Sequence, residues 1–408
     1  MKEKQHIPAG YKSSPLGIIP EDWEVKRLGE IAEITSGTTP SRENSSFYSN
    51  GTIPWVKTTD LNNNILNKTE ELVTEKAVAQ TSLKILSSGT VLVAMYGGFN
   101  QIGRTALLGV DATVNQALSA IVCKQEVFNH YVLAWLNCHV RGWKRLAASS
   151  RKDPNITGKD VERFPILVPK IEEQQRIVSV LSLWDTAISK QTALIEKLTI
   201  RKRGLMQQLL TGKKRLKGFE GEWKEVKLGD VFDERNETNR GDLPLLSITG
   251  DKGVIYQSES DKRDISNEDK TKYKRICPND IGYNTMRMWQ GRSALSELEG
   301  IVSPAYTIVT PKKTVDVRFM AMLIQQPRIV YVFWTHSQGL VSDTLNCKFP
   351  DFCQVKVTIP SKAEQTAIAD FFVAIDKEIE IQKQKLTSLQ EQKKGLMQVL
   401  LTGKKRVK

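Results

Sequence analysis

Two stretches of the chain, residues 172–215 and 363–406, carry apolar side chains at alternating steps of four and three. This spacing is the heptad pattern of a helix that packs along another helix. In each stretch eight of the ten seam positions are apolar, so each predicts one long helix with a buried stripe. The first seam comprises Ile177, Leu181, Trp184, Ile188, Gln191, Ile195, Leu198, Lys202, Leu205 and Leu209. The second comprises Ile368, Phe372, Ile375, Ile379, Gln382, Leu386, Leu389, Lys393, Leu396 and Leu400.

The two stretches are copies of one another, because they align without a gap at an offset of 191 residues. Such internal repetition predicts two half-molecules of one design. Gly212 and its counterpart Gly403 stand where each helix should end, since glycine favours the position just after a helix. Gly204 and Gly395 fall inside the helices, where glycine costs about 1 kcal/mol relative to alanine. We expect this matched pair to pack closely against another backbone, unless it is inherited without a packing role.

The order of the repeats favours an antiparallel pairing of the two helices, because head-to-tail repeats close most simply around a pseudo-twofold axis. Gln191 lies at the middle of the first helix and Gln382 at the middle of the second, so this pairing would place them opposite each other. A buried polar pair of this kind can fix the register of two helices. The alternative is that both amides face solvent where the seam is loosened.

A longer segment precedes each repeat, and the two segments have similar ends around different interiors. Trp23 and Trp223 open them 200 residues apart, whereas Pro169 and Pro360 close them 191 residues apart, so the interiors differ by 200 − 191 = 9 residues. The predicted organisation is therefore two globular domains, 1–169 and 216–360, with long spacer helices in 170–215 and 361–408.

Both globular segments have the mixed pattern of an α+β domain. Short apolar runs between clusters of Gly, Asn, Ser and Pro predict strands, at Ile53–Lys57, Thr90–Met95, Leu118–Val122, Tyr306–Val309 and Gln354–Ile359. Helical patches are expected at Asn129–Asn137 and Arg318–Gln326.

Charge narrows the choice of partner. The chain has 408 residues and a net charge of 59 − 46 = +13, which favours nucleic acid. A basic protein on a membrane surface is the rival, but the longest apolar runs are far too short to span a bilayer. The N-terminus lacks the apolar core of a signal peptide, and five scattered cysteines favour reduced thiols. We therefore expect a cytoplasmic protein that binds no membrane.

One glycine-rich stretch, Gly98 to Thr105, comes close to a phosphate-binding P-loop. It has the glycine spacing and the threonine, but Arg104 stands where that motif has lysine. A loop between two strands is the plain alternative. The interpretation that we favour is a polar loop whose Asn100, Gln101 and Arg104 meet DNA.

Other catalytic signals are weak. The four histidines lack ligand spacing, and Cys347 and Cys353 have no second pair, so neither zinc nor another metal is expected. No nucleophile elbow and no glycine fingerprint for S-adenosylmethionine is present. We therefore expect a chain that catalyses nothing by itself and binds no cofactor.

Several polar turns have the residue types that read or hold DNA. Arginine pairs with guanine, and asparagine or glutamine with adenine, in the major groove. Any one of these residues could equally be ordinary solvated surface. The candidate DNA contacts are Lys57, Asn100, Gln101, Arg104, Arg151, Lys152, Arg287, Trp289, Gln290, Arg292 and Lys348.

The chain resembles the specificity subunit of a type I restriction-modification system over nearly its whole length. The resemblance rests on the alternation of variable domain and repeated helix, together with local signatures in order. These are Trp23…Arg27-Leu28-Gly29-Glu30-Ile31, Gly51-Thr52-Ile53-Pro54-Trp55-Val56, Val114-Asn115-Gln116, Phe164-Pro165-Ile166, and the helix end Leu-Leu-Thr-Gly-Lys. The second domain follows these signatures more loosely, which implies a different recognition subtype.

The resemblance implies an α+β fold with two target-recognition domains, each reading one half of a bipartite sequence in double-stranded DNA. Two long helices, paired as an antiparallel coiled coil, would separate the domains and set the gap between half-sites. It also implies two modification subunits that methylate adenine, and restriction subunits that translocate and cut DNA. S-adenosylmethionine, ATP and magnesium would then bind to these partners only. The alternatives are a P-loop-like nucleotide-binding enzyme and a coiled-coil scaffold that binds protein alone.

Overall fold

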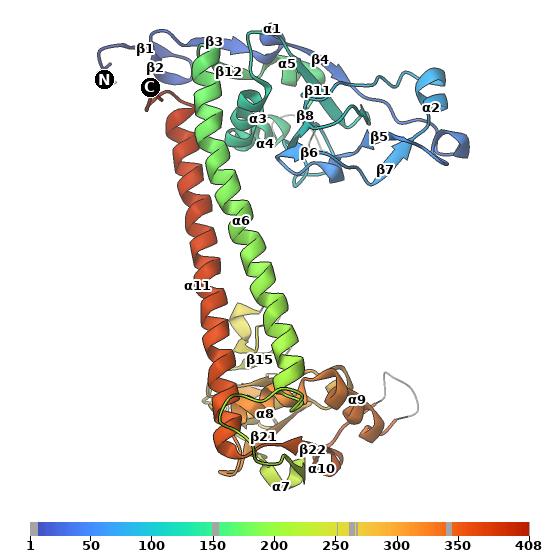
Figure 1. The fold of residues 1–408 in the computed structure, drawn as a ribbon, viewed down its shortest axis with the longest axis vertical. Helices are drawn as coiled ribbons and strands as arrows, with labels where there is room; N and C mark the ends of the chain where they lie inside the picture. The colour runs from blue at the N-terminus through green and yellow to red at the C-terminus, as the bar shows by residue number, and fades with distance from the viewer. Residues whose placement is uncertain are drawn as a thin grey trace. The chain divides into compact units, whose positions relative to one another are not determined.

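The computed structural model describes residues 7–148, 155–250, 252–260, 266, 268–339 and 345–407. The chain is divided into two compact units. Unit 1 comprises Met1–Thr192 with Lys385–Lys408, and unit 2 comprises Ala193–Gln384. Each unit combines one globular domain with part of both long helices (Figure 1). In the part of the chain that is described, no helix is long and apolar enough to cross a membrane.

The domain of unit 1 is built on a five-stranded sheet, antiparallel except for its last strand. Its spatial order is β4 (Ala32–Ser36), β11 (Leu118–Cys123), β8 (Val91–Ala94), β9 (Thr105–Leu108) and β6 (Ile65–Leu66). The remaining strands are β10 (Thr113–Val114), β5 (Ile53–Val56) and β7 (Glu71–Val73) in one sheet, and the pairs β1 (Tyr11–Ser14) with β2 (Gly17–Pro20) and β3 (Glu24–Arg27) with β12 (Pro165–Val168). Its short helices are α1 (Leu28–Ile31), α2 (Glu75–Gln80), α3 (Asn129–Cys138), α4 (Val140–Ala148) and α5 (Gly158–Arg163).

The domain of unit 2 is built on a four-stranded antiparallel sheet. Its spatial order is β14 (Phe232–Glu234), β21 (Tyr306–Pro311), β18 (Ile281–Asn284) and β19 (Ser293–Leu295). Three further pairs are β13 (Lys224–Lys227) with β22 (Lys356–Ile359), β15 (Leu246–Ile248) with β16 (Val254–Tyr256), and β17 (Lys274–Ile276) with β20 (Gly300–Val302). Its helices are α7 (Leu228–Val231), α8 (Val317–Ile324), α9 (Pro327–His336) and α10 (Phe349–Gln354).

The two domains share one frame. In both, an entry strand pairs antiparallel with the last strand, β3 with β12 and β13 with β22. The sheet order β4-β11-β8-β9 is matched by β14-β21-β18-β19, and two consecutive helices, α3–α4 and α8–α9, follow each sheet in sequence. These correspondences confirm the predicted α+β class and the internal repeat. The expected strands and helical patches are also confirmed, with ends within two residues of those predicted.

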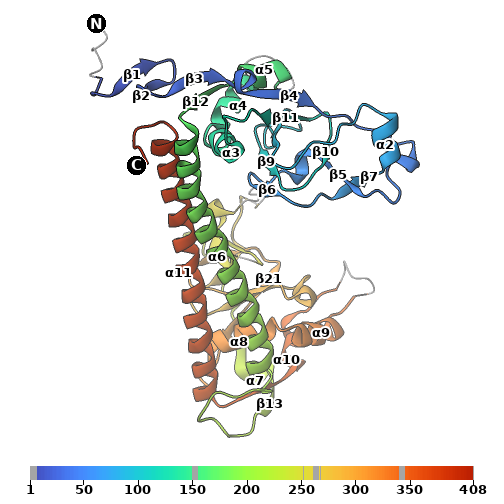
Figure 2. The same ribbon diagram turned by 45° about the horizontal axis from the view of Figure 1, so that its top comes forward.

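The long helices are α6 (Ile171–Leu209) and α11 (Lys362–Leu400), each of 39 residues. They run side by side in opposite directions within each unit, which confirms the antiparallel expectation (Figures 1 and 2). In unit 1 the Lys393 ammonium bonds to Asp185, and in unit 2 the Lys202 ammonium bonds to Asp376. These two ion pairs are copies of each other at the 191-residue offset, so the repeat preserves its interhelical contacts.

The seam predicted from the heptads lies against protein along both helices. Each of its twenty residues is buried or half-buried, Gln191 among the former and Gln382 among the latter. Apolar residues off the seam, such as Leu183 and Ile200, are exposed. The expectation of close packing at Gly204 and Gly395 is wrong, because a Cβ atom at either glycine would meet nothing within 4 Å.

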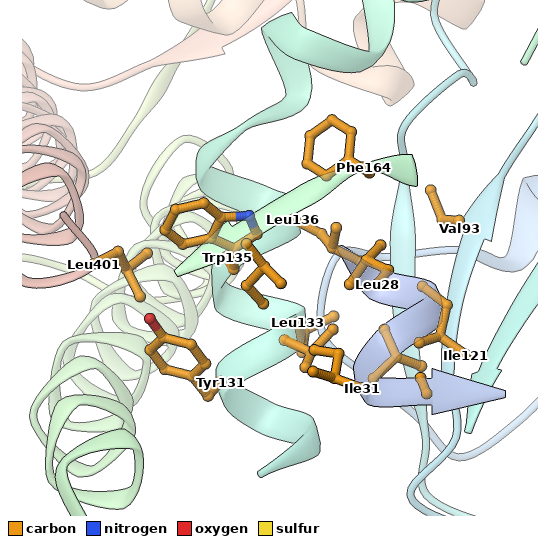
Figure 3. Packing of buried hydrophobic residues seen from close by; sticks show 14 of the residues in the cluster. Leu28, Ile31, Val93, Ile121, Tyr131, Leu133, Trp135, Leu136, Phe164 and Leu401 are labelled. Carbon is orange, nitrogen blue, oxygen red and sulfur yellow. The ribbon is translucent and has the colours of Figure 1, made fainter. Parts of the chain in front are cut away.

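Each long helix ends in the core of the domain that the other long helix follows. Leu400 and Leu401, at the end of α11, belong to the core of unit 1, and Figure 3 shows Leu401 beside Tyr131 and Trp135 of α3. Leu209 and Leu210 occupy the same place in the core of unit 2. The helices then stop where predicted, since Gly212 and Gly403 have positive φ angles of 71° and 70°. The repeat therefore builds part of each globular core.

Ion pairs also stabilise the segments that follow the C-terminal ends of the two long helices. The Arg406 guanidinium bonds to Glu173, at 2.6 Å from Nε to Oε1, and also to Asp22. In unit 2 the Arg215 guanidinium makes a two-pronged contact with Glu364, at 2.5 Å and 2.6 Å. Both glutamates are buried, and buried charges need such partners to offset lost hydration.

Buried glutamines fix the start of each long helix. Gln174 accepts a hydrogen bond from the backbone N–H of Phe128 at 2.8 Å and donates to the Pro169 carbonyl at 2.9 Å. Gln365 makes the matching bonds with Asp316 and Pro360, at 2.9 Å each. A long helix therefore leaves its domain in a direction set by a side chain in the repeat.

Candidate DNA interface

Two hairpin loops, one in each domain, hold most of the sequence-predicted contacts and are structural equivalents. The loop between β8 and β9 closes where the Ala94 N–H donates to the Arg104 carbonyl at 2.8 Å. The loop between β18 and β19 closes where the Asn284 N–H donates to the Arg292 carbonyl at 3.0 Å. In both, the residue before the arginine is a glycine with positive φ, 77° in the first and 73° in the second.

A short sequence match underlies this equivalence and was missed in the sequence analysis. Residues 103–107 read Gly-Arg-Thr-Ala-Leu, and residues 291–295 read Gly-Arg-Ser-Ala-Leu. Each glycine packs against the second of the two consecutive helices: a Cβ at Gly103 would meet Trp143 of α4, and one at Gly291 would meet Val330 of α9. The hairpin is thus part of the shared frame.

The first hairpin excludes the P-loop alternative. A P-loop needs a helix directly after its glycines, so that the helix N-terminus faces the phosphates. Here Gly103 is followed by strand β9, and the Thr105 hydroxyl is buried, donating to Asn137 at 2.6 Å. The Arg104 guanidinium is also directed inward, donating to Gln101 and to the Leu61 carbonyl.

Lys57 is held by acidic neighbours. Its ammonium lies 2.7 Å from Glu71 and 3.2 Å from Glu70, and these hydrogen bonds raise the pKa of Lys57. Arg42 shares Glu71 at 2.6 Å, and its guanidinium lies over the rings of two aromatic residues, Tyr48 and Trp55. The positive charge of Lys57 is therefore already balanced within the domain.

Three further cations of the first domain, which the candidate contacts above do not include, lie on α4. Arg141, Lys144 and Arg145 are spaced by three and four residues, so they share one helix face. The Lys144 ammonium lies 5.7 Å from the ring centre of Phe99, next to exposed Asn100. No carboxylate pairs with these three cations in the described part of the chain. Arg151 and Lys152 lie outside the described residues.

The second hairpin borders an open pocket of about 540 Å³ in unit 2, which we call the cation-lined pocket. Three cations contribute to it, and none of its described lining residues is acidic. Arg287 and Arg292 have no carboxylate partner among the described residues. The lining residues are Ile248, Thr249, Gly250, Lys252, Ile255, Ser260, Asn284, Arg287, Gln290, Arg292 and Tyr306.

Arg287 and Arg292 differ in this respect from two other arginines of the domain. Arg235 lies 2.7 Å from Asp280, and Arg275 lies 2.6 Å from Glu299. These two arginines are thus neutralised, whereas Arg287 and Arg292 of the pocket face solvent. Such a surface attracts anions.

The two other candidates of unit 2 lie outside the pocket lining. Trp289 is half-buried and its indole N–H donates to the Met286 carbonyl at 3.0 Å, so it stabilises the hairpin loop. Lys348 is exposed at the N-cap of α10, where its backbone N–H donates to Asp351. In the described ranges no cluster of His, Cys, Asp or Glu could hold a metal ion.

Known proteins with similar sequences include specificity subunits of type I restriction enzymes. The specificity subunit of the type I restriction enzyme EcoR124I/EcoR124II from Escherichia coli is 30% identical over 196 residues, which are 47% of this chain and 48% of that protein. The MjaIX specificity subunit from Methanocaldococcus jannaschii is 31% identical over 197 residues, 47% and 45%. The match thus spans about half the length of these relatives. The putative MjaX specificity subunit of that archaeon is 25% identical over 98% of this chain and 97% of its own.

Solved structures share the fold. The HsdS subunit from Thermoanaerobacter tengcongensis superposes with a TM-score of 0.51 at 16% identity, covering 94% of this chain and 98% of that one. A chain from a study of type I R-M complex assembly reaches a TM-score of 0.62 at 16% identity, covering 94% and 99%. The family model for the type I restriction modification DNA specificity domain matches twice, at residues 20–199 and 220–391. With both domains and most of both long helices inside these matches, the chain belongs to the type I restriction-modification DNA specificity family.

Proposed function

We propose that the chain recognises a bipartite sequence in double-stranded DNA, one half-site per domain. The observation that carries this proposal is that the two domains share one hairpin, which presents different polar and cationic side chains in each. In unit 1 the frame presents Asn100 beside the α4 cations, and in unit 2 it presents Arg287, Gln290 and Arg292 at the cation-lined pocket. Two domains with the same frame and different side chains would read two different half-sites.

The antiparallel helices would set the gap between the half-sites. Their seam residues are buried or half-buried and their ion pairs repeat at a fixed offset, which supports a stiff spacer. Inserting one heptad into both helices adds about 10 Å and should lengthen the gap by roughly three base pairs at about 3.4 Å each. An unchanged gap after this insertion would refute the spacer role.

The chemistry would belong to partner subunits. No metal cluster is present among the described residues, and the single P-loop candidate is a β-hairpin. We infer that the chain directs two modification subunits, which would bind S-adenosylmethionine and methylate adenine, and restriction subunits that use ATP and magnesium. It would act in the cytoplasm, where these partners meet DNA.

A methylation map tests the proposal directly. The chain is co-expressed with the modification subunit encoded beside it, in a host without adenine methylation of its own. Methyladenine should then mark one bipartite motif, and exchanging residues 20–199 for those of another family member should change one half of it only. A modification confined to continuous motifs would contradict two-domain reading. Failure of the complex to bind any duplex would favour the protein-only scaffold.

A further inference from the structure

The cation-lined pocket contains an unusual contact between a glycine and an arginine. A Cβ atom at Gly250 would lie 2.3 Å from Nη1 of Arg292 and 3.4 Å from its Cζ, far inside van der Waals contact. The guanidinium therefore occupies the space that any other residue would fill at position 250. Gly250 has no positive φ, so its backbone conformation does not require glycine. The absence of a side chain matters here for the position of Arg292.

The rest of the hairpin is held firmly enough to make this contact specific. The Arg292 N–H donates to the Arg287 carbonyl at 3.3 Å, and the Gly291 N–H donates to the Met288 carbonyl at 2.8 Å. Met288 is fully buried. With its backbone fixed, Arg292 can adjust only through its side-chain rotamers, so a substitution at Gly250 would redirect the guanidinium and leave the fold intact.

The equivalent arginine of unit 1 has a different environment. The Arg104 guanidinium donates to Gln101 at 2.9 Å and to the Leu61 carbonyl, so its donors are used within the domain. No carboxylate or carbonyl oxygen among the described residues accepts a hydrogen bond from the Arg292 guanidinium. One position of the shared frame thus serves folding in the first domain and carries an exposed guanidinium in the second.

The shape of the site favours a phosphate over a base. Base edges lie at the floor of the major groove, about 8.5 Å deep, and are reached by protruding side chains. Arg292 lies along the wall of a concave pocket with Lys252, and a concave cationic surface fits the projecting sugar–phosphate backbone. Phosphate contacts set the register of a protein on DNA without reading its sequence.

We propose that Gly250 is a positioning residue that lets the Arg292 guanidinium lie in the cation-lined pocket, where it holds a DNA phosphate. This inference rests on the proposed function, since it assumes that unit 2 faces duplex DNA. It assigns Arg292 to backbone binding, in contrast to the base-reading role that its residue type suggested.

The test compares Gly250→Ala, Arg292→Ala and the double variant in the full chain with its modification subunit. Affinity is measured by fluorescence anisotropy on a duplex with the mapped motif and on an unrelated duplex, over a salt series. Each single variant should weaken both duplexes alike, by about tenfold, and the slope of log affinity against log salt should fall by about 0.9. The double variant should be no weaker than Arg292→Ala alone.

Gly241→Ala is the matched control, because Gly241 lies in the same domain, has no positive φ, and has no atom within 4 Å of its Cβ position. It should bind as the wild type does. Wild-type affinity in Gly250→Ala would overturn the positioning role, and a loss confined to the duplex with the mapped motif would overturn the phosphate assignment. Both outcomes leave the proposed function standing, whereas a wild-type complex that binds neither duplex would refute both.

Discussion

Leu401, almost at the end of the chain, should be as important for the first domain as a central core residue. It is fully buried among the core residues of unit 1, beside Tyr131 and Trp135 (Figure 3). Burying a leucine contributes about 1.5–3 kcal/mol, and the cavity left by truncation adds to the loss. Leu401→Ala should therefore cost about 2–5 kcal/mol of unit 1 stability. Leu210→Ala should cost a similar amount in unit 2.

Hydrogen exchange followed by mass spectrometry separates the two effects, since it reports each helix by itself. Leu401→Ala should lower the protection of α3 amides and spare α8, and Leu210→Ala should do the reverse. Leu183→Ala on α6 is the control: its side chain is 69% exposed, so the change should stay within about 0.5 kcal/mol. A loss below about 1 kcal/mol for Leu401→Ala, or a loss of protection in α8, would refute the core assignment.

Three further changes follow from the helices and their ends. Gly204→Ala and Gly395→Ala should each stabilise the chain by about 1 kcal/mol, since neither Cβ meets a neighbour; a lower midpoint in urea unfolding would contradict this. The Arg406 guanidinium holds the pKa of Asp22 below its usual range, mainly by hydrogen bonding. That carboxylate therefore stabilises the fold at neutral pH, and this contribution is lost as the pH falls through the lowered folded-state pKa. In Arg406→Gln the free energy of unfolding should therefore decrease less steeply as the pH is lowered. Gln174→Leu should cost about 1–3 kcal/mol in thermal unfolding, because it leaves the partly buried backbone N–H of Phe128 and the Pro169 carbonyl without the Gln174 amide.

The frame of the molecule was predictable because it is repeated and periodic. Alternating steps of four and three predicted the two long helices, and the order of the repeats favoured their antiparallel pairing. The helix-stop glycines were predictable because glycine, which has no Cβ, adopts positive φ more readily than other residues. These features depend on local geometry, which neighbouring residues determine.

The site was less predictable, because residues distant in sequence decide whether a charged side chain is paired within the protein. Arg104 and Arg292 have the same residue type and the same place in a hairpin. Only the fold shows that Arg104 donates to the Leu61 carbonyl and that Arg292 lines an open pocket. Lys57 was selected for its charge, but strand β7 places Glu71 against it. Residue type alone therefore overestimates how many cations are available to DNA.

The interhelical ion pairs limit how the spacer can change. Asp185 and Lys202 are 202 − 185 = 17 residues apart on α6, and Asp376 and Lys393 are 393 − 376 = 17 apart on α11. Because the partners run antiparallel, both ion pairs can form only while these two distances are equal. An insertion of one heptad between Asp185 and Lys202 alone should break one pair and disturb the seam, lowering the unfolding midpoint. The same insertion in both helices should keep the midpoint and change only the gap, so a paired insertion as unstable as the single one would show that the seam does not set the register.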